Sequence, residues 1–169
     1  MAKHPLPSSN IEVMGWQICA LLEATPEIGL TTLGADYALD GVSGYVWYNL
    51  DWWLRILKDV TAQTSLDMLA LGMRAAERLS LPPWIDNISA ALLEVEDLYR
   101  RAHRGGEIGE VFGRVVHGRH IRFSVRTPYP EDFISGLVWG IAQRYAPHNS
   151  RLELTRNSID RATAFDVRW

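Results

Sequence analysis

The sequence predicts an α+β domain in which an N-terminal helical bundle packs on a small four-stranded antiparallel sheet. In the first part of the chain, up to about residue 104, apolar residues recur at three- and four-residue steps, which is the spacing of one helix face. After Gly106 the apolar period changes to two, which is typical of half-buried strands. One further helical stretch divides the strands into two pairs, so the C-terminal half is predicted to be β-β-α-β-β.

Four helical segments are expected before the sheet. Asn10 can cap the first, and Pro26 ends it because the residue before a proline is pushed out of the helical region. Pro82 ends the third, and Gly105 lies just past the fourth. The glycine-rich stretch 27–45 is interpreted as a structured loop. The expected helices are 10–24, 49–61, 65–79 and 84–104.

Beyond Gly106 the alternation predicts a β-hairpin, with strands around 112–116 and 121–125 and Gly118 in the turn. A helix begins at Glu131, and its Gly136 and Gly140 lie on one side, where they permit close approach to the sheet or to another helix. Two short strands are expected at 152–154 and 165–169.

Length and composition favour one globular domain. A chain of 169 residues can bury close to 70% of its unfolded surface, so it needs no metal or disulfide to build a core. We expect a disordered tail at 1–9 and a single domain at 10–169. No apolar run reaches the roughly 20 residues needed to cross a bilayer, and the N-terminus lacks a signal-peptide pattern, so a cytoplasmic protein without a membrane span is expected.

Charge is distributed unevenly along the chain. Residues 1–99 carry five Lys or Arg against thirteen Asp or Glu, whereas residues 100–169 carry twelve Arg against seven acids. We interpret this as an acidic helical half beside a basic half of one fold. Nucleic-acid-binding domains are usually basic as a whole, but this chain has a net charge of −3. No nucleic-acid partner is therefore expected.

No motif of reactive chemistry is present. The chain lacks a phosphate-binding loop, a nucleophile elbow, a zinc-protease helix and a dinucleotide fingerprint. Its only cysteine, Cys19, lies in an apolar run. His117 and His120 flank the expected turn and could form a cross-strand pair, but two ligands without a third make no metal site. A solvated hairpin tip, no catalytic residue, no metal and no cofactor are therefore expected.

The segment "PYPEDFISGLVWGIAQRY", followed by a strand pair ending in "FDVRW", resembles a known ligand-binding fold. That fold is shared by 4-vinyl reductase domains, heme-nitric-oxide-binding domains and the transport-particle (TRAPP) subunits of vesicle tethering. The resemblance runs from Asn10 onward and rests on element order and on the pattern of Phe133, Gly136, Leu137 and Gly140. It implies that a heme, a lipid chain or another small apolar molecule lies between bundle and sheet.

Heme is nevertheless not expected. The resemblance implies a Tyr-x-Ser-x-Arg motif just before the Gly-Leu pair of the penultimate helix, and those positions are here Pro130, Asp132 and Ile134. The family's proximal histidine has His103 as its nearest candidate, which lies among arginines at a helix end and is expected to be solvated. The cysteines that flank this helix in vinyl-reductase-like members, where they could hold a metal, are absent.

The remaining signal is aromatic abundance, with seven Trp, six Tyr and four Phe. Trp52 and Trp53 point about 100° apart on a helix, so one can enter the core while the other faces a cavity or an interface. Trp47 and Trp52 are assigned to a partner interface. The alternative is that all these rings only fill the core. The predicted ligand pocket consists of Trp16, Trp53, Phe123, Phe133 and Trp139.

These patterns favour a non-catalytic sensory or regulatory domain that binds a small apolar ligand and changes its association with a partner. A second hypothesis is a homodimeric scaffold without a ligand, whose exposed tryptophans and basic sheet face bind protein. An enzyme or a heme-based gas sensor has the least support. An enclosed cavity beside Trp53 and Trp139 would favour the first hypothesis, and a filled core with a large apolar surface patch would favour the second.

Overall fold

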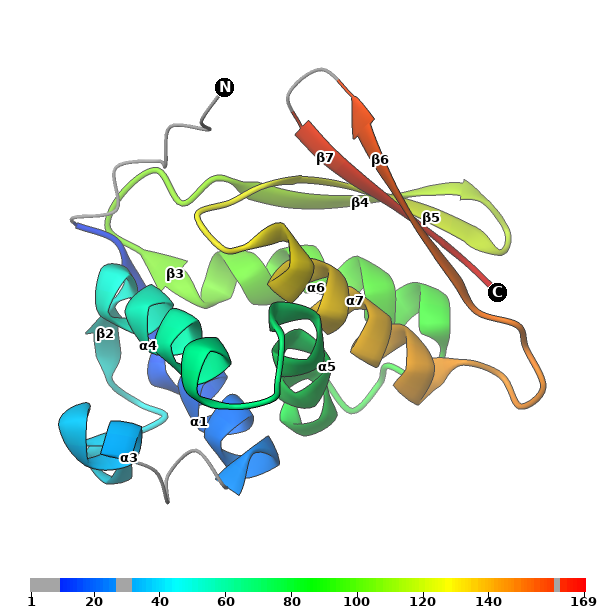
Figure 1. Cartoon of the computed structure of the whole chain (residues 1–169). Helices are drawn as coiled ribbons and strands as arrows, with labels where there is room; N and C mark the ends of the chain where they lie inside the picture. Colours follow the sequence, from blue (N-terminus) through cyan, green and yellow to red (C-terminus); the bar gives the residue numbers. More distant parts are fainter. Residues whose placement is uncertain (1–9, 27–31, 160–161) are drawn as a thin grey trace.

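A layer of helices lies under one face of a four-stranded sheet in the computed structural model, which describes residues 10–26, 32–159 and 162–169 (Figure 1). The predicted α+β class is confirmed. The expected tail, residues 1–9, lies outside the described part of the chain. Among the residues described, none of the helices combines the length and the apolar character that crossing a bilayer requires.

Side-chain caps begin the three long helices that precede the sheet. The side-chain oxygens of Asn49, Asp67 and Asn87 accept hydrogen bonds from backbone N–H groups three residues on, at 3.1, 2.8 and 3.0 Å. Such caps satisfy N–H groups that the helix itself leaves unpaired. The helices are α1 (Gly15–Ala24), α3 (Thr32–Asp36), the 3₁₀ turn η1 (Leu39–Gly41), α4 (Leu50–Gln63), α5 (Met68–Arg78), α6 (Ile88–Arg101) and α7 (Glu131–Tyr145).

A small second sheet was not predicted. It consists of β1 (Glu12–Met14), β2 (Trp47–Asn49) and β3 (His103–Arg104) in the order β2-β1-β3, all antiparallel. The expected cap at Asn10 is therefore wrong, because the chain enters β1 and its helix begins only at Gly15. For the same reason the fourth predicted helix ends before His103. The stretch predicted as a loop contains α3 and η1.

The main sheet follows the predicted β-β-α-β-β order. Its strands are β4 (Glu110–His117), β5 (His120–Arg126), β6 (Glu153–Ile159) and β7 (Ala162–Arg168), arranged β4-β5-β7-β6 with every pair antiparallel. The predicted turn at Gly118 is confirmed. On the inner face Phe123 lies opposite Phe165, and both are fully buried. Figure 1 shows α6 and α7 beneath this face.

Helices α5 and α7 touch at their backbones. A Cβ atom on Gly72 of α5 would lie 2.1 Å from the carbonyl oxygen of Phe133, and one on Gly136 of α7 would lie 2.1 Å from that of Leu69. A Cβ atom on Gly140 would lie 2.6 Å from the Cβ atom of Ala76. The close approach that the glycine spacing predicted is thus made to another helix, and only residues without a side chain allow it.

Replacing Gly136 by Ala should lower the free energy of unfolding by about 1–3 kcal/mol, because the added methyl group overpacks the contact. The loss should appear although alanine is the better helix former by about 1 kcal/mol. Urea denaturation of the full chain measures it. Gly118→Ala is the control, since a Cβ atom on Gly118 would have no other group within 4 Å. Equal stability of the two variants would contradict the backbone contact.

Candidate functional site

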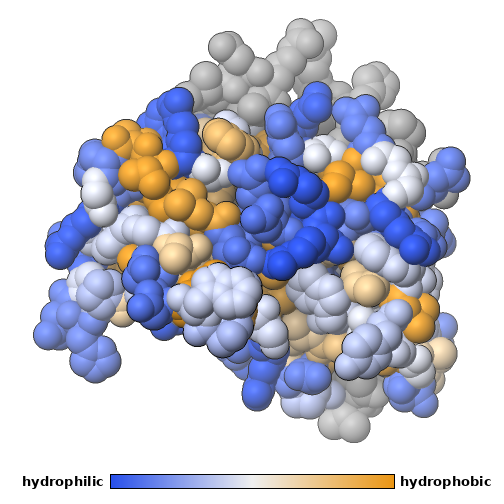
Figure 2. Space-filling view, turned by 180° about the vertical axis from the view of Figure 1, so that it is seen from behind, coloured by the Kyte–Doolittle hydropathy of each residue, from blue (hydrophilic) through white to orange (hydrophobic). Residues whose placement is uncertain are grey.

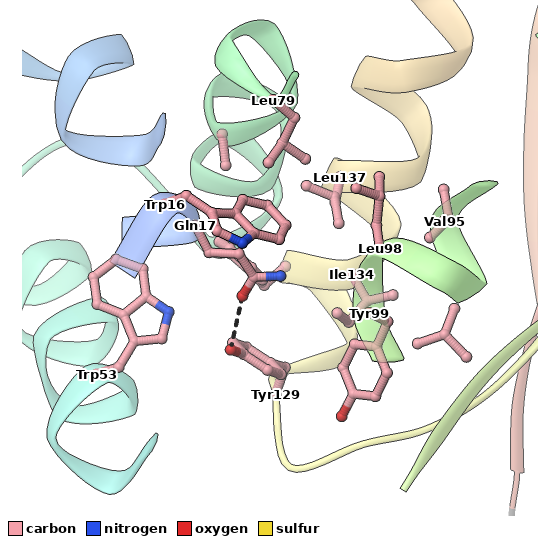
Figure 3. A pocket seen from close by; sticks show the side chains of 13 residues that line it. Trp16, Gln17, Trp53, Leu79, Val95, Leu98, Tyr99, Tyr129, Ile134 and Leu137 are labelled. Carbon is pink, nitrogen blue, oxygen red and sulfur yellow. Dashed lines mark hydrogen bonds between the residues drawn. The ribbon is translucent and has the colours of Figure 1, made fainter. Parts of the chain in front are cut away.

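A small, partly open cavity lies where the helices meet below the sheet (Figure 3). It offers about 30 Å³ to the centres of water-sized molecules, and since one water needs about 10–15 Å³, there is room for two or three. Most of the wall is apolar. The lining residues are Trp16, Gln17, Trp53, Ala75, Leu79, Val95, Leu98, Tyr99, Val111, Tyr129, Phe133, Ile134 and Leu137.

Two helices, α6 and α7, supply neighbouring parts of this wall. Val95, Leu98 and Tyr99 lie three and four residues apart on α6, and Phe133 and Leu137 lie four apart on α7, so each set forms one stripe. Figure 3 shows Val95, Leu98, Tyr99 and Leu137 on one side of the space and Trp53 on the other. The apolar stripes of α6 and α7 therefore meet at the cavity without filling the volume between them.

The structure brings together three of the five residues of the predicted pocket. Trp16, Trp53 and Phe133 line the cavity. Phe123 lies under the sheet with its ring against Gly113, and Trp139 is half-buried on α7; neither contributes to the wall. Trp53 is 1% exposed, whereas Trp16 is only half-buried.

The two tryptophans predicted for an interface are held by neighbours within the chain. The guanidinium of Arg104 lies over the ring of Trp47 at 4.4 Å from the centroid. Trp52 stacks on Tyr48 with ring centroids 5.4 Å apart and meets Tyr37 edge-on at 6.3 Å. Both tryptophans are half-buried, and their role in an interface stays a prediction.

A buried polar corner adjoins the cavity, centred on His103. This residue is 5% exposed, so the expectation that it is solvated is wrong. The cause is the pairing of β3 with β1, which places His103 inward and leaves Arg104 outside on Glu12. The two ring nitrogens of His103 lie 2.7 Å from the carbonyl oxygen of Tyr99 and 2.9 Å from the hydroxyl of Tyr129.

These contacts fix the protonation of the imidazole. A carbonyl only accepts, so Nδ1 of His103 carries the proton that is donated to Tyr99. Burial lowers the pKa of His103 to about 4, and the backbone hydrogen bond opposes this only in part. The ring is therefore neutral near pH 7, and its Nε2 accepts the proton of the Tyr129 hydroxyl. Gln17 Oε1 lies farther from that hydroxyl, at 3.3 Å.

Both tyrosines of this corner stay protonated. Burial raises the pKa of Tyr99 and of Tyr129 above the ordinary value. The Tyr99 hydroxyl donates to the carbonyl of Ile108. The corner thus carries no charge near pH 7 and has its hydrogen bonds internally satisfied. In the described ranges no three His, Cys, Asp or Glu side chains are grouped so that they could hold a metal ion.

Sequence reasoning missed Tyr129 and Gln17. Tyr129 stands between two prolines in the predicted link from strand to helix, a place where an exposed residue is expected. The one local signal that could have indicated a buried Tyr129 is its position between two prolines, because these restrict the backbone on either side of it. Gln17 gives no signal at all, since it lies at a polar position of an apolar helix.

A second polar cluster lies on the outer face of the main sheet. The carboxylate of Asp166, 1% exposed, accepts hydrogen bonds from His120, from Arg122 at 2.9 and 3.1 Å and from Asn157 at 2.7 Å. Burial would raise the pKa of Asp166, but the hydrogen bonds from Arg122 and His120 outweigh it and lower the pKa. This cluster ties three strands together.

The histidine pair of the hairpin is adjacent, as predicted. His117 pairs with His120 across the turn, and their ring centroids are 5.1 Å apart. The expected solvated tip is only half correct, because His117 is exposed whereas His120 is 4% exposed and bound to Asp166. Arg122 lies on the outer face of the sheet, beside Asp166.

Comparison with known proteins shows the fold. No protein-family model matches the chain, and no curated protein sequence does. Solved H-NOX structures do match in fold. The H-NOX protein from Shewanella oneidensis in the Fe(II)NO state is 12% identical with a TM-score of 0.68, over 92% of this chain and 98% of that one. The H-NOX protein from K. algicida in an unliganded Fe(II) form is 13% identical with a TM-score of 0.67, over 92% and 95%.

The likeness to these structures confirms the heme-nitric-oxide-binding part of the predicted resemblance, at the level of fold. The likeness to 4-vinyl reductase domains and to transport-particle subunits stays a prediction.

The free energy of unfolding should fall as the pH is lowered from about 6.5 to about 4. In that window the unfolded chain takes up a proton at His103, whose ordinary pKa is 6.5, while the folded chain, with a pKa of about 4, excludes it. The full loss is about 3 kcal/mol, at 1.36 kcal/mol per unit. His103→Asn, which keeps an N–H for Tyr99 but does not titrate, should flatten this dependence in urea denaturation. His117→Asn should leave it unchanged. The interpretation fails if the His103 variant keeps the wild-type slope.

Asp166→Asn should destabilise the fold by about 2 kcal/mol, because Arg122 loses its counter-charge and His120 loses a carboxylate partner. Breaking a fully buried pair costs about 3–5 kcal/mol, and the value here is smaller because the side chain of Arg122 is 31% exposed. Thermal denaturation monitored by circular dichroism measures the loss. Glu153→Gln, which removes an exposed partner of Arg151, is the control and should change stability by less than about 1 kcal/mol. A neutral Asp166 variant would show that the cluster does not hold the strands.

Proposed function

We propose that the chain is a non-catalytic sensory or regulatory domain that binds a small apolar molecule in the cavity below its sheet and thereby changes its association with a partner. The observation that supports this is the cavity wall. Ten of its thirteen residues are apolar or tryptophan, and the polar corner beside them is neutral and internally hydrogen-bonded. Such a wall favours an apolar guest over water, because water needs two to four polar partners to stay and the amide of Gln17 is the main polar group that the lining offers beyond the internally bonded tyrosines.

The volume of the cavity limits the size of the ligand. With room for two or three water-sized molecules, the cavity fits a diatomic gas, a noble-gas atom or a small hydrocarbon as it stands. A larger molecule enters only if side chains of the wall rotate. None of the lining residues is an acid, a cysteine, a serine or a lysine, so the site binds and does not react.

Heme, the group whose redox potential is modulated in one of the similar solved structures, does not fit these residues. His103 is the one buried histidine beside the cavity among the described residues, and its two nitrogens are bound to Tyr99 and Tyr129. It does not line the space, and no lining residue is a cation that could hold propionate groups. The free volume is also that of a few waters. We therefore propose no heme for this chain.

The scaffold hypothesis has one observation in its favour. Phe112, Val115 and Val116 of the edge strand β4 are 47, 54 and 45% exposed. Figure 2 shows apolar surface on the side of the molecule where the β4–β5 hairpin lies. Exposed apolar patches mark interaction sites. This surface is therefore our candidate for the site that binds the partner, and the ligand would change that association.

Xenon should bind in the cavity and shift the methyl NMR signals of Leu79, Ile134 and Leu137. Xenon enters dry apolar cavities without needing polar contacts. The methyl groups of Leu57, fully buried but outside the cavity, should not move. Shifts that are absent, or that are equally large at Leu57, would contradict the proposed function.

Filling the cavity should be tolerated where filling the core is not. Ala75 lines the cavity, whereas Ala91 is fully buried elsewhere. Ala75→Val should abolish the xenon shifts and change stability by less than about 1 kcal/mol, since it occupies free space. Ala91→Val, with the same helix-propensity cost, should lose about 1–3 kcal/mol through overpacking. Urea denaturation compares the two, and equal losses would mean that there is no free space beside Ala75.

A further inference from the structure

Strand β4 is an unpaired edge of the main sheet. In the order β4-β5-β7-β6 it is hydrogen-bonded to β5 on one side, and within the described ranges no strand pairs with its other side. The backbone N–H and C=O groups along such an edge can pair with a strand of another chain. Phe112, Val115 and Val116 are exposed along β4, and the strand contains neither proline nor lysine. It therefore lacks two of the features that usually prevent strand addition.

The opposite edge of the sheet, β6, is protected. The described side chains of this strand, residues 153–157, are polar except for Leu154, which is half-buried. Arg156 binds Glu131 and Asp132 at the start of α7, so it points inward from the sheet. An inward-pointing charge on an edge strand opposes the addition of another strand. The two edges of the sheet therefore differ, and β4 is the one that is open.

The charges along β4 are complementary to those of a second copy of β4. Glu110, Phe112 and Arg114 lie at alternate positions, hence on one face, which is the outer face that Arg122 of β5 shares. When two copies of β4 pair antiparallel with Phe112 opposite Phe112, Glu110 of each copy lies opposite Arg114 of the other. Side chains at opposite positions have Cβ atoms about 4.5–5.5 Å apart. This register therefore forms two ion pairs around one aromatic pair.

Both charges are available for these pairs. Glu110 and Arg114 are exposed, and within the described part of the chain neither has an ion-pair partner. Inside the sheet Arg114 lies opposite Arg122, another guanidinium, and Glu110 lies opposite Arg126, which is bound to Glu107. A second copy would place a carboxylate on the free side of Arg114, where its own chain supplies none.

A bulge sets the length of this ladder. The register with β5 shifts between Val115 and His117, and bulges bend and twist a strand. The regular stretch before the shift that contains the charges is Glu110–Arg114, five residues centred on Phe112. Five to six residues is about the commonest strand length. The two-fold register that uses all five residues is the one that brings the opposite charges together.

We propose that a second copy of this chain pairs with β4, and that Glu110–Arg114 of the two copies form an antiparallel ladder that joins the two main sheets. Such a contact uses the same surface on both copies and closes on itself. Because β6 is protected, the product is a dimer and not a fibre. The inference names the partner in the proposed function, and it rests on that function for any effect of a ligand on the dimer.

Sedimentation velocity of the full chain over a range of concentrations tests the dimer. The wild type should show a monomer–dimer equilibrium. Glu110→Arg or Arg114→Glu alone should weaken the dimer on the order of tenfold, because each change turns two attractive pairs into two repulsive ones. The double variant Glu110→Arg/Arg114→Glu restores both pairs with reversed sign and should dimerise as the wild type does. Thr155→Arg, at an exposed position of β6, is the matched control and should change nothing.

A cysteine cross-link tests the register without changing a charge. Opposite residues of an antiparallel ladder have Cα atoms about 4.5–5.5 Å apart, a distance that a disulfide spans. Phe112→Cys, combined with Cys19→Ser so that one thiol remains, should give a covalent dimer on mild oxidation. Thr155→Cys with Cys19→Ser is the control and should stay monomeric. Equal cross-linking of the two variants would overturn the register.

The remaining outcomes separate this interface from the proposed function. A wild type that stays monomeric at its highest soluble concentration leaves the edge to a strand of a different protein and overturns the second copy. Single-charge variants that dimerise as the wild type does, or a double variant that does not regain the dimer, overturn the ladder, as do species larger than a dimer. A monomer whose cavity methyl groups still shift with xenon contradicts this inference alone. A dimer without those shifts contradicts the proposed function and leaves the interface.

Discussion

The backbone contact between α5 and α7 is the constraint on which the rest of the structure depends. Gly72 and Gly136 let the two helices approach until each backbone meets the other's carbonyl groups. Since α7 connects β5 to β6 in the chain, fixing α7 on α5 also fixes where the sheet lies over the bundle. Arg144 reinforces the contact by donating to the carbonyls of Ala76 and Leu79 at the end of α5. The backbone contact sets the distance between α5 and α7. The cavity is the volume that the side chains of the surrounding helices leave unfilled beside this contact.

Whether such a volume can stay free of water depends on the polar groups around it. His103 donates to the carbonyl of Tyr99 and accepts from the hydroxyl of Tyr129, and the hydroxyl of Tyr99 donates to the carbonyl of Ile108. None of these three side chains therefore needs a water molecule in the cavity. In the described part of the chain a single buried side-chain oxygen lacks a partner, that of Thr127, and it does not line the cavity. A buried imidazole would attract water or an anion if it were charged, but burial lowers its pKa below the neutral range. The polar corner therefore adds no charge beside the apolar wall of the cavity.

Periodic patterns made most of the fold predictable, and contacts between distant segments made the rest unpredictable. The hairpin around Gly118 and the stripes of α6 and α7 follow from local alternation, which each segment carries by itself. The sheet of β1, β2 and β3 has strands of two or three residues, too short for any alternation, and it exists only because three segments meet. The burial of His103 follows from that sheet and was missed with it. Within the candidate site, large aromatic residues could be predicted to be inside, but whether a ring lines the cavity, as Phe133 does, or lies against a glycine of the neighbouring strand, as Phe123 does, depends on how helix and sheet meet.

Under the proposed function, the small sheet is the element that would connect an occupied cavity to the surface. Trp16 and Gln17 lie two and three residues after the end of β1, and His103, which accepts a hydrogen bond from Tyr129, lies in β3. Both strands meet in one ladder, and β2 on its other side carries Trp47, whose ring is covered by Arg104 of β3. A guest that displaced Trp16 or Tyr129 would therefore act on β1 and β3, which are hydrogen-bonded to each other. The fold that this chain shares with solved H-NOX structures thus connects the cavity wall to Trp47 through the main-chain hydrogen bonds of the small sheet.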